Sequence, residues 1–129
     1  MCTLDEQVSV QMIIERIKAH LKLKNIRFAL GSPEQAPQKS SFVKTIALCA
    51  GSGGSVLKGV KTDMYLTGEM SHHDVLDAVS KGIHVVLCEH TNTERGFFAD
   101  TFKSVLYDML ESKVEVLVSS EDSDPIAIV

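Results

Sequence analysis

The stretch VKTIALCAGSGGSVLKGV, residues 43–60, decides the fold class. Its first eight residues form an apolar and β-branched run that is short enough for a strand. A glycine-rich loop follows at 51–55, and a helix-like stretch at 56–60 comes after it. The stretch therefore predicts a strand, a tight loop and a helix in that order.

The same order recurs along the rest of the chain. Further strand-length runs lie at 64–67, 83–88 and 114–118. Helix-like stretches lie between them, at 71–80 and at the stretch marked by Phe98, Phe102, Val105 and Met109. This alternation predicts an α/β fold with a mixed, largely parallel sheet and helices on both faces.

The chain before residue 43 adds one helix and one strand. Ile13, Ile17 and Leu21 recur at helical spacing from Val10 onward, which predicts an amphipathic helix. The apolar run 26–30 predicts a strand, and the Pro-, Gln- and Ser-rich segment 32–41 predicts a loop. With 129 residues, the chain is long enough for a single α/β domain with its own core.

The overall composition excludes several classes of partner. The formal net charge is -4, and clustered Lys and Arg are sparse, so direct nucleic-acid binding is not expected. No apolar run approaches the length of about 18 residues that spans a membrane. Three cysteines with no CxxC pair fit a reducing compartment, so we expect a cytoplasmic location, with the nucleus as an alternative.

Nearly all of the polar chemistry follows the predicted strands. In a parallel sheet, loops after the strands gather side chains and helix N-termini at one edge. Three junctions between strand and helix therefore matter, at residues 49–55, 67–74 and 88–96.

The third junction contains a pair of metal-ligand type. His90 and Glu94 are four residues apart, so they share one face if a helix begins by Thr91. An imidazole with a carboxylate is a common pairing for a divalent metal. In the alternative interpretation, Asn92 or Thr93 caps the helix and Glu94 is favoured in its first turn by the helix dipole.

The second junction places Glu69 at the end of a predicted strand. This carboxylate is a candidate metal ligand, a candidate partner that orients His90, and a candidate catalytic base. Ser71 with Asp74 three residues later predicts a helix cap. His72 and His73 are adjacent and point in different directions on a helix, so at most one of them faces the pocket of His90.

The first junction is the glycine loop. Its backbone N–H groups are candidates to hold a phosphate, although neither a P-loop lysine nor GxGxxG is present. The alternatives are a nucleophile elbow at Ser52 and, with more support, a tight turn that lets the backbone approach a neighbouring site. Cys49 and Cys88 end predicted strands, where free cysteines are small buried hydrophobes more often than thiolate ligands.

Three motifs in order resemble the NIF-three-like family of NGG-one-interacting-factor proteins, often described as GTP cyclohydrolase type 2 homologues. They are LCAGSGGS at 48–55, YLTGEMSHHD at 65–74 and HTNTERG at 90–96. The opening helix and Asp124-Pro125 near the end are similar to the eukaryotic branch. The resemblance covers the chain and corresponds to the C-terminal half of the family's usual length.

The resemblance implies a dinuclear site for divalent metal ions (Zn, Fe or Mn) inside a homo-oligomer, usually a hexamer. It assigns His90 and Glu94 as metal ligands here, while the other ligands come from the family's N-terminal half. The implied function is a metal-dependent hydrolase, with Glu69 as the candidate catalytic group, although this part alone is expected to be inactive. The alternative is an interaction protein with a transcription-related partner, in which the metal is structural.

Overall fold

The computed structural model describes residues 1–32, 42–121 and 124–126. The chain divides into two compact units, Met1–Thr93 and Glu94–Val129. The predicted loop 32–41 lies outside the described residues, apart from Ser32.

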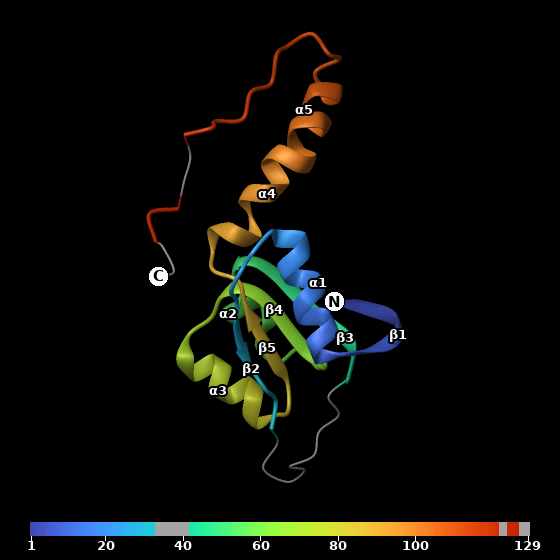
Figure 1. Ribbon diagram of the computed structural model, residues 1–129, viewed down its shortest axis with the longest axis vertical. Helices are drawn as coiled ribbons and strands as arrows, with labels where there is room; N and C mark the ends of the chain where they lie inside the picture. The colour runs from blue at the N-terminus through green and yellow to red at the C-terminus, as the bar shows by residue number, and fades with distance from the viewer. Residues whose placement is uncertain (33–41, 122–123, 127–129) are drawn as a thin grey trace. The chain divides into compact units, whose positions relative to one another are not determined.

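The first unit is a mixed five-stranded sheet with helices (Figure 1). Along the sheet the strands lie in the order β1-β3-β4-β5-β2. The three inner strands run parallel, and each edge strand is antiparallel to its neighbour. The elements in chain order are β1 (Cys2–Ser9), α1 (Val10–Leu21), β2 (Arg27–Ala29), β3 (Phe42–Ser52), α2 (Gly54–Leu57), β4 (Met64–Glu69), α3 (His72–Ser80), β5 (His84–Leu87) and the 3-10 turn η1 (Thr91–Thr93).

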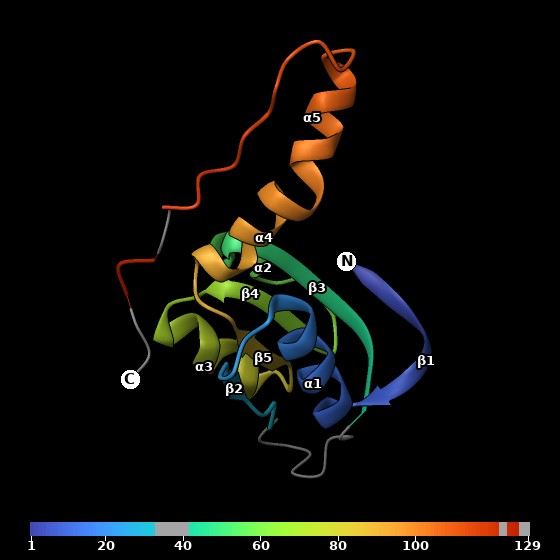
Figure 2. The ribbon, with the colours of Figure 1, turned by 45° about the horizontal axis from the view of Figure 1, so that its top comes forward.

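Helices cover both faces of this sheet, as the alternation of strands and helices predicts (Figure 2). On one face, Ile13 and Ile17 of α1 pack with Met64 and other strand residues in a buried cluster. On the opposite face, a second cluster joins Leu57 of α2 and Ala78 of α3 to the strands. Successive residues of a strand point to opposite faces, so Met64 and its neighbour Tyr65 fall into different clusters.

Local side-chain bonds fix where the first-unit elements begin. The Ser9 hydroxyl accepts a hydrogen bond from the N–H of Met12 at 3.2 Å, which caps α1 at its predicted start. Asp63 accepts from the N–H groups of Lys44 and Thr45, at 3.0 and 2.9 Å, and so holds the start of β4 against β3. The Asp63 bonds join the segment just before β4 to β3, next to the parallel pairing of the two strands.

The second unit contains one continuous helical stretch at 95–109. It comprises α4 (Arg95–Phe97), the π-helical turn η2 (Phe98–Phe102) and α5 (Lys103–Met109). None of these helical residues is buried. The strand predicted at 114–118 is wrong, because these residues have no regular structure. An alternating sequence becomes a strand only when a neighbouring strand takes up its backbone hydrogen bonds.

The structure differs from the sequence-based expectations in two further elements. The helix expected at 56–60 is displaced and short, since α2 occupies Gly54–Leu57. The edge strand β1 is not predicted from the sequence, because its hydrophobic residues are few; two of them, Leu4 and Val8, are half-buried against the core cluster. Within the described part of the chain, no helix has the length and apolar character needed to span a membrane.

Candidate functional site

The three junctions meet at one edge of the sheet, as their place after parallel strands predicts. Cys49, Thr67 and Leu87 are neighbours across β3, β4 and β5. Beyond them, Ser52 pairs with Glu69. Residues from the first two junctions therefore lie beside each other, although 17 positions separate Ser52 from Glu69.

Glu69 and His90 form the polar contact at this edge. Nδ1 of His90 lies 2.6 Å from Oε1 of Glu69. A carboxylate only accepts hydrogen bonds, so the imidazole donates through Nδ1 and carries its lone pair on Nε2 when neutral. The side chains are 46% and 48% exposed, which leaves the pair accessible from solvent. The structure thus brings together two of the residues singled out in the sequence.

The residues after His90 do not form the helix that would place His90 and Glu94 on one face. Thr91–Thr93 form a 3-10 turn, and the α-helix begins only at Arg95. Asn92 and Thr93 do not cap that helix, because their side chains bond backward to the carbonyls of Cys88 and His90, at 2.8 and 2.7 Å. Glu94 is the first residue of the second unit.

The Ser71 cap predicted from the sequence is confirmed. The Ser71 hydroxyl accepts from the N–H of Asp74 at 3.2 Å and donates to its carboxylate at 2.6 Å. This bond, with a smaller contribution from Lys58, holds the pKa of Asp74 below its ordinary value. His72 and His73 are exposed in the first turn of α3, with their ring centroids 6.2 Å apart.

The glycine loop is a tight turn in which the amides of Gly51 and Gly53 bond within the protein. Gly51 has φ +65°, a conformation that favours glycine. Its N–H donates to Thr93 Oγ1 at 2.8 Å, and the N–H of Gly53 donates to the Glu69 carbonyl at 3.2 Å. These bonds favour the tight turn over a phosphate cradle, and the short helix α2 supplies no helix-terminal site.

The two cysteines near this edge lie with different faces of the sheet. Cys88 is buried in the cluster beneath α1, whereas Cys49 is half-buried against the other cluster. Burial, with a smaller effect of the Glu89 charge, raises the pKa of the Cys88 thiol to about 11. At neutral pH this thiol is therefore protonated and behaves as a small buried hydrophobe.

Two features of this edge are not predicted from the sequence. Glu89, just before His90, has φ +68° and pairs with Arg27 of β2 at 2.8 Å. Gly68 lies against the backbone of Gly51 and of the 89–90 segment. These close approaches join distant parts of the chain, so no local sequence pattern predicts them. The sequence offers one signal for Glu89, which is an ionisable side chain directly before His90 at the end of a predicted strand.

The donor set fits part of a metal site. An imidazole whose Nδ1 is held by a carboxylate is the usual arrangement of a metal-ligating histidine. Across residues 1–32, 42–121 and 124–126, no group of three or more His, Cys, Asp or Glu side chains converges as a metal-binding cluster. Tight zinc sites take three or four protein ligands, so the described residues fit a contribution to a site rather than a complete one.

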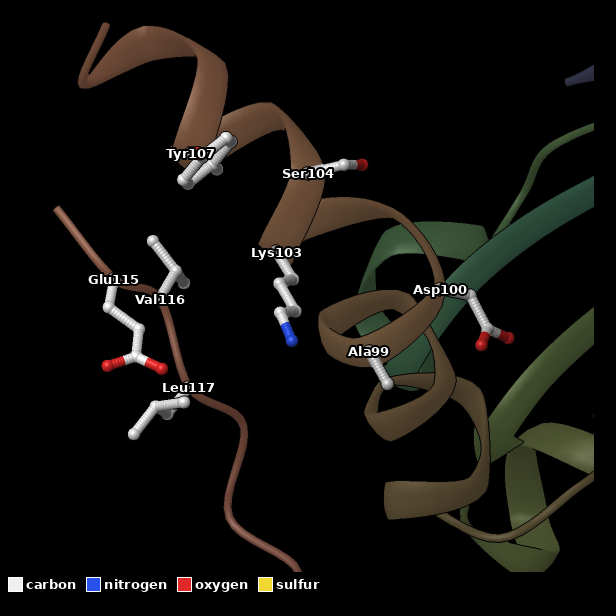
Figure 3. Close-up of a pocket in the computed structure, with 8 residues that line it drawn as sticks. All are labelled: Ala99, Asp100, Lys103, Ser104, Tyr107, Glu115, Val116 and Leu117. Carbon is white, nitrogen blue, oxygen red and sulfur yellow. The ribbon is translucent and has the colours of Figure 1, made fainter. Parts of the chain in front are cut away.

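Each unit also has a pocket. In the first, a largely apolar groove of about 370 Å³ lies between α1 and the strands, with Arg16, His20 and Thr93 among its polar lining. In the second, a pocket of about 440 Å³ lies between α5 and the segment 115–117 (Figure 3). There Tyr107 lies toward that segment, while Ser104 and Asp100 point away from it.

Comparison with solved structures supports the fold. A Staphylococcus aureus protein, SA1388, is 25% identical with a TM-score of 0.70, over 98% of this chain and 40% of that chain. A Bacillus cereus protein related to NIF3 is 23% identical with a TM-score of 0.71, over 98% of this chain and 34% of that chain.

Comparison with curated sequences identifies relatives over the whole chain. NIF3-like protein 1 of Rattus norvegicus is 59% identical over 129 residues, and NGG1-interacting factor 3 of Saccharomyces cerevisiae is 39% identical over 127 residues. These matches cover 100% and 96% of this chain but 33% and 42% of the relatives. The chain therefore spans about a third of the rat relative's length.

The model of the family Duf34/NIF3 (NGG1p interacting factor 3) matches residues 1–125. This match covers all the described elements, including the edge that carries Glu69 and His90. The chain belongs to the Duf34/NIF3 family.

Proposed function

We propose that this chain contributes His90, oriented by Glu69, to a divalent-metal site of a metal-dependent hydrolase. The observation that carries the proposal is the 2.6 Å contact between His90 Nδ1 and Glu69 Oε1 at a solvent-accessible sheet edge. Glu94 is proposed as a further ligand, on the family resemblance of the third motif. The remaining ligands would come from outside the residues described here.

The proposed roles follow from the donor chemistry. A bound Zn, Mn or Fe ion would polarise a phosphoryl or carbonyl oxygen and lower the pKa of a bound water. Glu69 would fix the imidazole tautomer that presents Nε2, and its half-exposed carboxylate is also placed to accept a proton. Imidazole with carboxylate suits all three metals, so the site chemistry alone does not select one.

Calorimetric titration of the chain with Zn²⁺ or Mn²⁺ tests this proposal. We expect weak binding, because the two proposed ligands in this chain, His90 and Glu94, are fewer than the three or four protein ligands of a tight site. His90→Ala should abolish the binding, and Glu69→Gln should weaken it about 10- to 100-fold through the loss of the orienting bond. His72→Ala, at an exposed histidine of the same unit, is the matched control and should leave the titration unchanged.

Two results would contradict the proposal. One is tight, stoichiometric metal uptake that His90→Ala leaves unchanged. The other is the absence of any uptake by the unsubstituted chain at millimolar metal.

A second candidate function is protein interaction in transcriptional regulation. The Saccharomyces cerevisiae relative, 39% identical, bears the name NGG1-interacting factor 3. On that basis we propose that this chain takes part in binding a transcription-related protein, with the metal supporting the fold or a homo-oligomer. The exposed apolar side chains of the second unit would then be the first surface to test.

A chimera separates the two candidates. This chain would replace the matching third of rat NIF3-like protein 1, with which it shares 59% identity. Phosphatase or nucleotide-hydrolase turnover with added Mn²⁺, Zn²⁺ or Fe²⁺ that is lost in Glu94→Gln would favour the enzyme. No turnover, with protein binding that Glu94→Gln leaves intact, would favour the interaction protein.

A further inference from the structure

Three backbone segments cross at Gly68. A Cβ atom on this residue would lie 2.7 Å from the carbonyl oxygen of Gly51, 2.8 Å from Cα of His90 and 2.9 Å from the carbonyl oxygen of Glu89. All three neighbours are backbone atoms, so no side-chain rotation could relieve the overlap. Only glycine therefore lets β4 end between the first and third junctions with the spacing seen here.

Thr93 ties the same two junctions together from the other side. Its hydroxyl accepts from the N–H of Gly51 at 2.8 Å and donates to the carbonyl of His90 at 2.7 Å. Beneath them, the buried Thr67 hydroxyl donates to the Gly51 carbonyl at 3.0 Å. Thr93 is therefore a direct bridge from the glycine loop to the residue whose imidazole meets Glu69.

We infer that Gly68 and Thr93 are positioning residues that hold His90 against Glu69. Gly68 sets how closely the His90 backbone approaches β4, the strand that carries Glu69, and Thr93 fixes the His90 carbonyl to the glycine loop. Neither residue touches the reacting groups. The inference rests on the proposed function for its biological meaning, but the geometry it describes is independent of any metal.

The test uses the full chain in metal-free buffer with a chelator, so its outcome does not depend on whether the proposed metal site exists. Long-range ¹H–¹⁵N NMR reports which imidazole nitrogen of His90 carries the proton. We expect an Nδ1–H tautomer in the unsubstituted chain and in Gly96→Ala, where the nearest atom to an added Cβ is a side-chain oxygen 3.9 Å away. Gly68→Ala should shift the His90 signals toward the Nε2–H tautomer, because Nδ1 is displaced from the Glu69 carboxylate.

Thr93 provides a second test that adds no bulk. Thr93→Val removes the bridging hydroxyl and should shift the His90 signals in the same direction, whereas Thr93→Ser keeps the hydroxyl and should restore them. This pair decides the matter if Gly68→Ala does not fold. Nδ1–H signals unchanged in Thr93→Val, or in a folded Gly68→Ala, would overturn the inference, and so would an unsubstituted chain without the Nδ1–H tautomer.

Discussion

The Cys88 side chain links burial to a measurable pH dependence. Its pKa is about 11 in the folded chain, against an ordinary value of 9.0. The folded state therefore favours the neutral thiol. The stability that this preference contributes is complete below pH 9 and is lost as the pH rises from 9 to 11. Two pKa units correspond to about 2–3 kcal/mol of unfolding free energy.

Alkylation kinetics and unfolding together check this prediction. At pH 8 the raised pKa leaves Cys88 with about 100-fold less thiolate than a cysteine of ordinary pKa has. Cys88 should therefore react far more slowly with iodoacetamide than the exposed Cys2. The free energy of unfolding, measured with urea, should fall more between pH 8 and pH 11 in the unsubstituted chain than in Cys88→Ala, which lacks the titrating group. Equal alkylation rates at the two sites would contradict the burial of Cys88.

At the same scale, the sequence identified residue types better than their contacts. Glu69 was expected to act as ligand, base or orienting partner of His90, and the structure brings the two side chains together. The close contacts of Gly68 and the bond between Thr93 and Gly51 are not predicted, because they join segments more than 15 residues apart. Spacing along one element can suggest a shared face, but it carries no information about such crossings.

Among the elements, the start of α3 offers a direct measurement. Ser71→Ala should lower the free energy of unfolding by about 1 kcal/mol, since the hydroxyl satisfies a helix N–H that otherwise lacks an intrahelical partner. The Ser71 bond also lowers the pKa of Asp74, so that contribution is present above the ordinary value of 3.8 and is lost as the pH falls. The loss caused by Ser71→Ala should therefore shrink in acid.

Urea unfolding at pH 7 and pH 3 measures this difference. Ser80→Ala is the matched control, because its hydroxyl bonds to the carbonyl of Asp77 at the other end of the same helix and does not cap its start. A Ser71→Ala loss no larger than that of Ser80→Ala, or one that grows in acid, would contradict the capping account.

The elements that the sequence predicted correctly are those with a strong local signal. Helix α1 matches its expected bounds because apolar spacing and the Ser9 cap agree. The inner strand β5 is an apolar run whose four residues are all buried, which is the pattern of a central parallel strand. The segment 114–118 is also rich in β-branched residues, but strand formation needs a partner strand as well, and no local pattern supplies one.

For the whole molecule, the two units differ in how they are stabilised. The first contains two buried clusters that join helices to both faces of a sheet. In the second, none of the helical residues is buried, and large apolar side chains such as Phe97, Met109 and Leu117 are exposed. Short helices in water depend on packing of an apolar face, so the stability of the second unit should be lower.

Amide hydrogen exchange on the full chain measures that difference. We expect strong protection in β4 and β5, whose residues are mostly buried, and protection at 98–109 that is weaker by at least about 100-fold, a difference of about 3 kcal/mol in opening free energy. Helix α1 is the control, because it has solvent-exposed positions, as the second unit does, but its other face packs into a buried cluster. Its amides should therefore be protected more strongly than those at 98–109. Exchange at 98–109 that is as slow as in β4 would contradict this expectation. The apolar side chains of the second unit would then have to be buried in solution, for example by self-association. Protection that rises with protein concentration would identify self-association as the cause.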